Sequence, residues 1–312
     1  MCAPTLHDWG TDECKRRHLR PLFTCAEVWC QLFSEPGAGS DFAGLATRAV
    51  RDGDEWVVNG QKVWTTLAHV SRFGLLVART DPQEVKHAGL TAFIVDMRAP
   101  GVDVRPLRQI TGEAEFNEVY FTDTRIPDRC RLGGPGDGWR VSLTTLMNER
   151  TSIGGSVPAR GSGTIRHLME VWGALPADRR DAVARDAVIR LWIRAEVLRL
   201  TNARASEQRR RGSPGPEGSI GKMASASLNQ AIHDHVMTLL GADALLCGSD
   251  ATVRPTTAGG ATTAQQAFLR SRANTIEGGT TEVMKNILGE RVLGLAGDVR
   301  VDRDVPWVDV PR

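Results

Sequence analysis

Residues 31–41 read Gln31-Leu32-Phe33-Ser34-Glu35-Pro36-Gly37-Ala38-Gly39-Ser40-Asp41. They alternate between apolar and polar side chains, then break at a proline into a glycine turn. Residues 57–66 read Val57-Val58-Asn59-Gly60-Gln61-Lys62-Val63-Trp64-Thr65-Thr66. This second stretch predicts a hairpin turn at Asn59-Gly60, followed by a strand that ends in one large aromatic side chain and two hydroxyls. A flat redox-active heterocycle with a pyrophosphate tail needs such hydroxyls, an aromatic wall and glycine-turn N–H groups, so the two stretches predict a flavin site.

The composition is that of an ordinary globular protein. The chain has 312 residues, of which 41% are hydrophobic and 24% are charged, which is enough for one large domain or two smaller ones. The formal charge is only +2, from 39 basic and 37 acidic residues. Such a balance gives no strong field to attract nucleic acid or an anionic membrane. No apolar run approaches the roughly 20 residues of a membrane helix.

The cysteines give no sign of a metal site. The six cysteines form no C-x-x-C pair and show no ligand spacing. The first residues lack the apolar core of a signal peptide, and a disulfide framework is uncommon in a chain of this size. We therefore expect a cytoplasmic protein without a structural metal.

The chain changes in character near residue 135. Before it, short alternating segments are separated by turn residues at close spacing, which is typical of a small barrel or sandwich. These predicted strands are 45–50, 55–58, 73–78, 90–95, 102–105 and 118–121. After it, apolar residues recur with helical spacing. The predicted helices are 139–153, 178–211 with Asp178 as N-cap, 217–240, 262–273 and 281–292. Five helices with short breaks indicate an antiparallel bundle.

Several polar residues on these helices have both a structural and a functional interpretation. Ser142, Thr145, Glu149 and Ser152 form a narrow polar lane on the first helix, which favours a solvated face over a pocket when taken alone. The glycine turn before the last helix, with Thr280 or Thr281 as the candidate N-cap, fits either a plain cap or a contact between helix N-terminus and cofactor. His233 and His235 lie two apart, so they point to different faces and suit no metal.

The two opening stretches are joined by Thr111-Gly112 through Phe116-Asn117-Glu118-Val119 and by Gly278-Gly279-Thr280-Thr281-Glu282-Val283. Together, and in this order, these motifs resemble the acyl-CoA dehydrogenases over most of residues 10–295. The resemblance implies an α+β multidomain fold. A middle β-barrel that binds flavin would occupy residues 29–134, and a C-terminal antiparallel helical bundle 135–312. Residues 1–28 would be the remnant of an N-terminal helical domain that is mostly missing.

The resemblance also implies roles for individual residues. FAD would be bound by Leu32, Phe33, Ser34, Gly39, Trp64, Thr65, Thr66 and Thr280. The acyl-CoA substrate would meet Ser40 and Arg150. Some members carry the catalytic base directly before the Gly-Thr of the last motif, where this chain has Gly278. The isovaleryl-CoA and long-chain types carry it before an arginine on the earlier helix, so Glu149 is the expected base and Glu277 the alternative.

The implied reaction is FAD-dependent α,β-dehydrogenation of an acyl-CoA thioester to the trans-2-enoyl-CoA, as part of fatty acid or lipid catabolism. Electron-transfer flavoprotein would be the electron acceptor, and the chain would form a homo- or hetero-oligomer, a dimer or tetramer. The Arg…Phe-Gly segment that many members extend to a neighbouring subunit is not recognisable within residues 209–221. Two alternatives therefore stay open: a catalytically incomplete subunit of a hetero-oligomer, or a flavin enzyme of the same fold with other chemistry, such as a nitroalkane oxidase.

Overall fold

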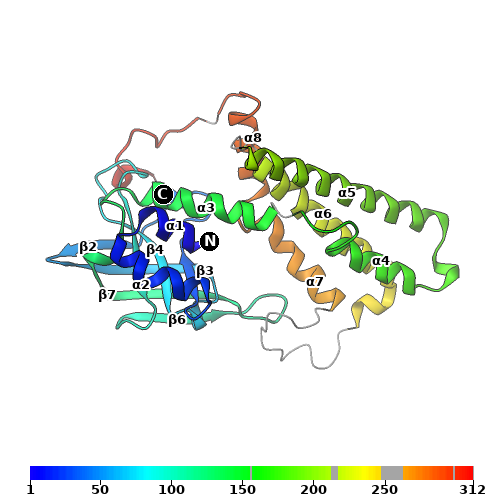
Figure 1. Cartoon of the computed structure of the whole chain (residues 1–312), viewed down its shortest axis with the longest axis horizontal. Helices are drawn as coiled ribbons and strands as arrows, with labels where there is room; N and C mark the ends of the chain where they lie inside the picture. The colour runs from blue at the N-terminus through cyan, green and yellow to red at the C-terminus, as the bar shows by residue number, and fades with distance from the viewer. Residues whose placement is uncertain (155–156, 212–216, 247–262, 298, 312) are drawn as a thin grey trace. The chain divides into compact units, whose positions relative to one another are not determined.

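The computed structural model describes residues 1–154, 157–211, 217–246, 263–297 and 299–311, except the side chains of residues 150–154, 209 and 217. The chain forms two compact units (Figure 1). The first comprises Met1–Gln109, Ala114–Asn148 and Asp298–Arg312, and the second Ile110–Glu113 and Glu149–Gly297. These units differ from the expected ranges, because the first part of the helix after residue 135 and the C-terminal segment pack with the β-domain.

The first unit is built on an eight-stranded sheet. Its strands are β1 (Trp29–Leu32), β2 (Arg48–Asp52), β3 (Glu55–Thr66), β4 (Phe73–Arg79), β5 (Leu90–Asp96), β6 (Val102–Leu107), β7 (Phe116–Pro127) and β8 (Arg131–Leu132). The order is β6-β7-β3-β2-β4-β5-β8, and β1 pairs in parallel with β4. Within the described residues the strands pair as an open path from β6 to β8. A β-domain followed by helices confirms the fold class expected from the sequence.

The predicted hairpin turn at Asn59-Gly60 is wrong. Both residues lie inside β3, where the register with β7 shifts between Val58 and Gly60. A Cβ on Gly60 would come within 2.4 Å of the Thr47 hydroxyl oxygen, so close backbone approach requires glycine there. The hairpin turn lies earlier, between β2 and β3, where Gly53 has φ +61°.

Alternate residues of the central strands enter two different cores. Phe73, Leu75 and Val77 of β4 face one cluster, and Leu76 and Ala78 face the other. The first cluster includes residues from three helices that cover this side of the sheet: α1 (Cys2–Trp9), α2 (Asp12–Phe23) and α3 (Gly138–Gly154). Because both faces of β4 and β5 are buried, these strands read in sequence as continuous apolar runs.

The first residues of the polar lane on α3 face the protein interior, whereas the sequence favours a solvated face. Ser142 and Thr145 are fully buried. The Thr145 hydroxyl lies 2.8 Å from that of Thr5 on α1, and Ser142 donates to the Gly138 carbonyl. These hydrogen bonds satisfy the hydroxyls without water, which is what allows a polar lane to lie under a second helix.

The C-terminal segment lies against the β-domain. The Trp307 indole N–H donates to the Gly44 carbonyl at 3.2 Å, and the Arg79 guanidinium lies 4.2 Å from the Trp307 ring centroid. Arg79 is itself buried and donates to the carbonyls of Ala43 and Leu45. The segment thereby fixes the loop that follows the Gly39-Ser40 turn.

The second unit is helical. Its helices are the end of α3, then α4 (Thr164–Ala174), α5 (Ala182–Arg210), α6 (Glu217–Leu240), α7 (Ala264–Ser271) and α8 (Thr281–Arg291). Helix α4 was not expected. Helix α5 begins later than expected, because Asp181 rather than Asp178 accepts from the Ala184 N–H as a cap. The other helices lie close to their predicted ranges.

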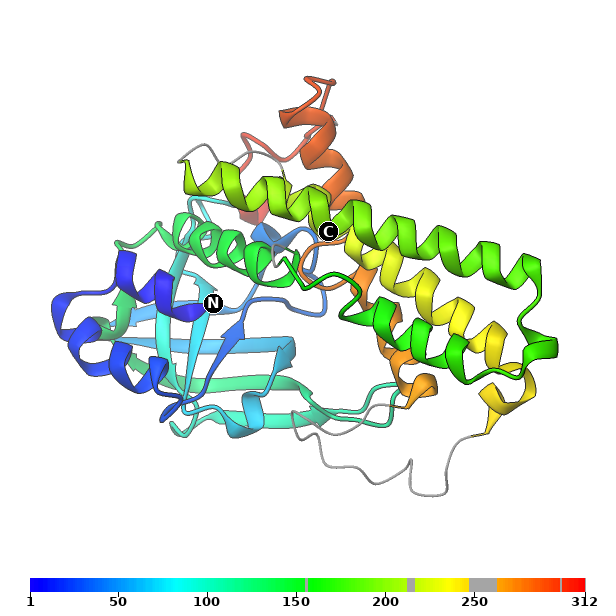
Figure 2. The same ribbon diagram turned by 45° about the vertical axis from the view of Figure 1, so that its right-hand side comes forward.

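Helix α6 is central to this unit and packs against α4, α5, α7 and α8 (Figure 2). The core between α4, α5 and α6 contains Leu168, Leu191, Leu228 and Ile232. None of the helices among the described residues combines the length and apolar character that crossing a bilayer demands.

Candidate active site

The ends of β1 and β3 meet where the two opening stretches come together. The Val63 N–H donates to the Ser34 carbonyl at 2.9 Å. Next to it, β3 shifts register between Lys62 and Thr65, and Trp64 adopts φ +59°. This left-handed conformation is unusual for a bulky residue and marks a bulge that aims the side chain out of the sheet. The indole is 57% exposed, so it is available to cover a ligand.

Thr65 and Thr66 provide the hydroxyls beside this indole. Thr66 is exposed, whereas Thr65 is buried and its Oγ1 has no hydrogen-bond partner among the described residues. A buried hydroxyl without a partner is unfavourable unless a ligand or water completes it. The exposed aromatic ring and the unsatisfied hydroxyl fit the face and the polar edge of a flavin.

Contacts of Leu32 and Phe33 with FAD stay a prediction. Both side chains are buried in the cores, and the Phe33 ring stacks on Phe42 with centroids 4.9 Å apart. In contrast, Gly39 and Ser40 lie exposed in the turn after β1. This turn therefore offers backbone and hydroxyl groups to a ligand.

A buried ion pair that the sequence interpretation missed holds this loop in place. Lys62 Nζ donates to Glu35 Oε1 at 2.8 Å and to the Phe33 carbonyl at 2.9 Å. The Glu35 carboxylate also accepts from the N–H groups of Ala46 and Thr47. The sequence contains two signs of this pair, a lysine within a predicted strand and a glutamate in a glycine-rich turn. Neither residue alone indicates whether its charge is buried or exposed.

In the helical unit, Glu277 is fully engaged. Its two carboxylate oxygens accept from the Arg270 guanidinium at 3.0 and 2.9 Å, and Oε1 also accepts from Asn274 Nδ2 at 2.8 Å. A carboxylate bound by a bidentate arginine is held away from proton transfer. This geometry disfavours the alternative base.

Glu149 is half-buried near the end of α3, where the second unit begins. Its charge is among those that act on Lys222, a buried lysine of α6. The pKa of Lys222 is lowered by burial, which the charges of Glu277, Glu282 and Glu149 oppose. The side chain of Arg150 lies outside the described residues.

Thr280 is the N-cap of α8, and its hydroxyl accepts from the Val283 N–H at 3.1 Å. The structural interpretation of this motif is therefore confirmed, and a contact between Thr280 and FAD stays a prediction. The two preceding glycines, Gly278 and Gly279, have φ +63° and +91°. Such values favour glycine and explain the Gly-Gly pair.

A pocket of about 370 Å³ lies within the helical unit. Its apolar wall includes Trp192, Leu228 and Ile232, and its polar part includes Lys222 and Glu277. Gly161 and Gly163 also line the pocket, in the segment between α3 and α4, and both have positive φ values. The pocket gives this unit a space that is lined by both apolar and polar side chains.

The chain is thus a protein of the two-domain class in which a β-domain is followed by a helical bundle. Residues 30–124 match the middle domain of the acyl-CoA dehydrogenases, and residues 136–293 match their C-terminal domain. The chain belongs to the acyl-CoA dehydrogenase family.

Relatives in mycobacteria are similar over almost the whole chain. Acyl-CoA dehydrogenase IpdE1 of Mycobacterium tuberculosis is 38% identical over 305 residues, which are 96% of this chain and 75% of IpdE1. Acyl-CoA dehydrogenase FadE34 of the same species is also 38% identical, over 94% of this chain. The chain spans only 39% of the length of FadE34.

Solved structures show the same architecture. The ChsE4-ChsE5 complex from Mycobacterium tuberculosis is 31% identical with a TM-score of 0.78, over 95% of this chain and 76% of that one. The Tcur3481-Tcur3483 steroid acyl-CoA dehydrogenase is 27% identical with a TM-score of 0.82, over the same shares. A glutaryl-coenzyme A dehydrogenase complex, at 20% identity and a TM-score of 0.81, shares the fold.

Proposed function

We propose that this protein catalyses the FAD-dependent α,β-dehydrogenation of an acyl-CoA thioester. The observation that carries the proposal is the junction of β1 and β3, where the Ser34–Val63 hydrogen bond brings the glycine turn beside Trp64 and Thr65. Family membership supports this use of the junction, since that is where the two opening motifs meet.

In this proposal the chain's own residues bind and orient the cofactor and substrate. Thr65 Oγ1 donates to or accepts from the polar edge of the ring, and the exposed Trp64 indole shields one face from water. The backbones of Leu32 to Ser34, the Gly39 turn, Thr66 and Thr280 complete the FAD site. Ser40 and Arg150 contact the CoA thioester. Bound FAD would accept the hydride that leaves the substrate β-carbon.

Glu149 is the proposed base. It takes the α-proton of the thioester on a carboxylate oxygen while the β-hydrogen leaves with its electron pair, so that a carbon–carbon double bond forms. Two observations favour it over Glu277: the bidentate contact of Glu277 with Arg270, and glycine rather than a carboxylate at position 278. Electron-transfer flavoprotein is the proposed acceptor of the electrons.

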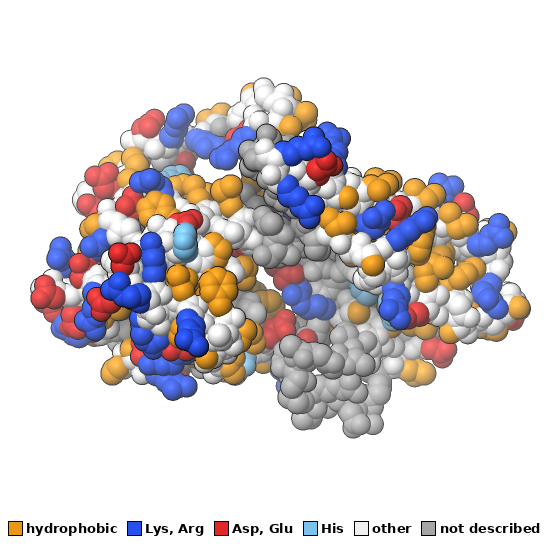
Figure 3. Space-filling model, viewed as in Figure 1, with side chains coloured by type: hydrophobic (Ala, Val, Ile, Leu, Met, Phe, Trp, Pro, Cys, Tyr) orange, Lys and Arg blue, Asp and Glu red, His pale blue; other side chains and the backbone are white. Residues whose placement is uncertain are grey.

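We further propose that the active assembly contains a second acyl-CoA dehydrogenase chain. The names of two similar structures, ChsE4-ChsE5 and Tcur3481-Tcur3483, pair two different chains. In this protein α5 carries an exposed apolar stripe, the α5 face, made of Ile189, Ile193, Val197 and Leu200. Hydrophobic side chains are visible over the helical unit in Figure 3. An exposed stripe of this kind is typical of an interface between subunits.

Because the names of those relatives include a steroid enzyme, a steroid-derived acyl group is the proposed substrate class.

The test is to purify the full chain, alone and co-expressed with a second family member, and record its visible spectrum. We expect a yellow protein with bound FAD that bleaches when an acyl-CoA is added without oxygen. A yellow protein that bleaches with a nitroalkane but not with acyl-CoA would support the same-fold alternative. A protein that stays colourless in every combination contradicts the proposal.

A further inference from the structure

Lys222 of α6 is a buried cation that forms no salt bridge with any residue the structure describes. Its side chain is 1% exposed. Its Nζ donates to the Asn274 carbonyl at 2.9 Å and to the Gly279 carbonyl. Within the part of the chain that the structure describes, no carboxylate oxygen lies within 4.0 Å of it. Burying an ammonium group is costly unless it is hydrogen-bonded or paired, so its position calls for a reason.

The two carbonyls that Lys222 binds lie at the two ends of one turn. Asn274 lies in the short helix Arg272–Thr275, and Gly279 directly precedes the N-cap of α8. Between them lie Glu277, the alternative base, and Gly278. One ammonium therefore fixes both ends of the segment 274–279.

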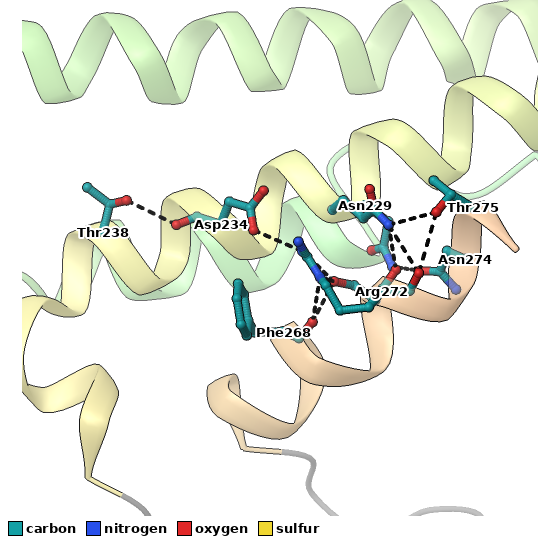
Figure 4. A network of polar contacts seen from close by, with 9 residues as sticks. Asn229, Asp234, Thr238, Phe268, Arg272, Asn274 and Thr275 are labelled. Atoms are coloured by element: carbon teal, nitrogen blue, oxygen red, sulfur yellow. Dashed lines mark hydrogen bonds and ion pairs between the residues drawn. The ribbon is translucent and has the colours of Figure 1, made fainter. Parts of the chain in front are cut away.

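Further contacts from α6 hold the same segment. Asn229 Nδ2 donates to Asn274 Oδ1 at 2.5 Å. Gln230 Nε2 donates to the Ser271 and Arg272 carbonyls and to Thr275 Oγ1. Figure 4 shows Asn229 of α6 beside Asn274 and Thr275 of the turn. Lys222, Asn229 and Gln230 are seven and eight residues apart, which places them on one side of the helix.

The charge of Lys222 acts on carboxylates from three elements. Glu149 comes from α3, Glu277 from the turn and Glu282 from α8, and each favours the charged form of the lysine. Burial opposes them and is the larger effect on the pKa of Lys222, which lies below its ordinary value. Glu149 and Glu277 are also the two carboxylates between which the base must be chosen.

We propose that Lys222 is a positioning residue of the dehydrogenation site, whose ammonium fixes the turn 274–279 and supplies the positive charge that acts on Glu149. This inference rests on the proposed function. A purely structural lysine would lend stability only, whereas a positioning lysine also sets the ionisation of the base. The two roles are therefore separable by experiment.

The first measurement needs no activity. Hydrogen exchange of the full chain with bound FAD is compared for wild type, Lys222→Met and Lys285→Met, where Lys285 is exposed on α8 and provides the matched loss of charge. We expect exchange within residues 274–284 to accelerate at least tenfold in Lys222→Met and to stay unchanged in Lys285→Met. Equal exchange in all three proteins overturns the positioning role.

The second measurement is the pH profile of flavin bleaching by acyl-CoA, expressed per bound flavin. Loss of a neighbouring positive charge favours the protonated carboxyl, so the rising limb of the profile should move up by about one pH unit in Lys222→Met. The rate at neutral pH should fall about tenfold. Lys285→Met should match wild type.

Lys222→Gln is a second neutral variant, which keeps one donor for a carbonyl if the methionine variant does not fold. If the rising limb of the pH profile does not move in a folded neutral variant, the inference is overturned and the proposed function stays intact. A wild-type protein that binds FAD but is not bleached by acyl-CoA overturns the proposed function itself. The two failures are thus distinguishable.

Discussion

Lys62 Nζ lies 2.8 Å from Glu35 Oε1, and both side chains are buried beside the candidate flavin site. The pair joins β3 to the turn after β1, because Lys62 also donates to the Phe33 carbonyl and Glu35 accepts from the Ala46 and Thr47 N–H groups. The loop that is expected to meet FAD therefore depends on a charge pair behind it, rather than on its own sequence alone.

Removing either partner of this pair should destabilise the first unit strongly. Lys62→Met leaves a buried carboxylate without its cation, and Glu35→Gln leaves a buried ammonium, so each should cost about 3–5 kcal/mol of unfolding free energy. Urea denaturation followed by circular dichroism measures this. Asp52→Asn, which breaks the exposed pair of Asp52 with Arg125, is the control and should cost less than about 1 kcal/mol. Similar losses in all three variants would contradict the role of the buried pair.

The same pair should make stability fall in acid. Burial alone would raise the pKa of Glu35, but Lys62 and the hydrogen bonds from Thr47 and Ala46 outweigh it and hold the pKa below its ordinary value. The folded state thus binds the proton less tightly than the unfolded state. The stabilisation is therefore complete above about pH 4.5 and is lost as the pH falls through the folded pKa. The difference in unfolding free energy between wild type and Glu35→Gln should narrow between pH 5 and pH 3. A constant difference would show that the carboxylate charge is not involved.

Trp64 should matter for FAD and little for folding. Its side chain is more than half exposed, so Trp64→Ala should change the unfolding free energy by less than about 1 kcal/mol. Loss of the aromatic wall should weaken FAD binding about tenfold, measured by flavin fluorescence titration. Trp56, which is buried and donates to Asp128, provides the contrast, because Trp56→Ala should cost about 3–5 kcal/mol. Unchanged FAD affinity in Trp64→Ala would show that Trp64 does not contribute to FAD binding.

Glu149→Gln should abolish the bleaching of bound flavin by acyl-CoA, with a rate at least about 100-fold lower, while FAD stays bound. Glu277→Gln should retain most of the rate, because that carboxylate is held by Arg270 and Asn274. Single-turnover stopped-flow absorbance compares them. The reverse pattern would assign the base to Glu277.

The α5 face should be needed for assembly. Ile193→Asp places a charge in the centre of this face and should lower the sedimentation coefficient by separating subunits. Its effect on the unfolding free energy of the monomer should be small, because Ile193 is exposed in the single chain. Val183→Asp is the control, an exposed apolar position in the first turn of α5, ten residues before Ile193. An unchanged sedimentation coefficient for Ile193→Asp would exclude α5 from the interface.

The strands and most helices could be predicted because their signals are local. Phe73 to Ala78 and Leu90 to Val95 are apolar runs bounded by turn residues, and the structure places them as β4 and β5. Helix α4 was missed because its apolar pattern is short and Gly163 before it offers no side-chain cap. The turn at Asn59-Gly60 was wrong because a bulge and a hairpin share the same glycine signal, and only the pairing of β3 with β7 distinguishes them.

The amino-acid sequence was sufficient to predict a β-domain followed by helices, Trp64 with its hydroxyl neighbours, and the two carboxylates that compete as base. Which polar groups are buried, and with what partners, depends on how the chain folds. Lys62 meets Glu35 across 27 residues, and Lys222 meets the turn at Asn274 across 52. A charge in an apolar segment is tolerable only when distant backbone and side-chain groups satisfy it, and those groups are brought together by folding rather than by sequence spacing.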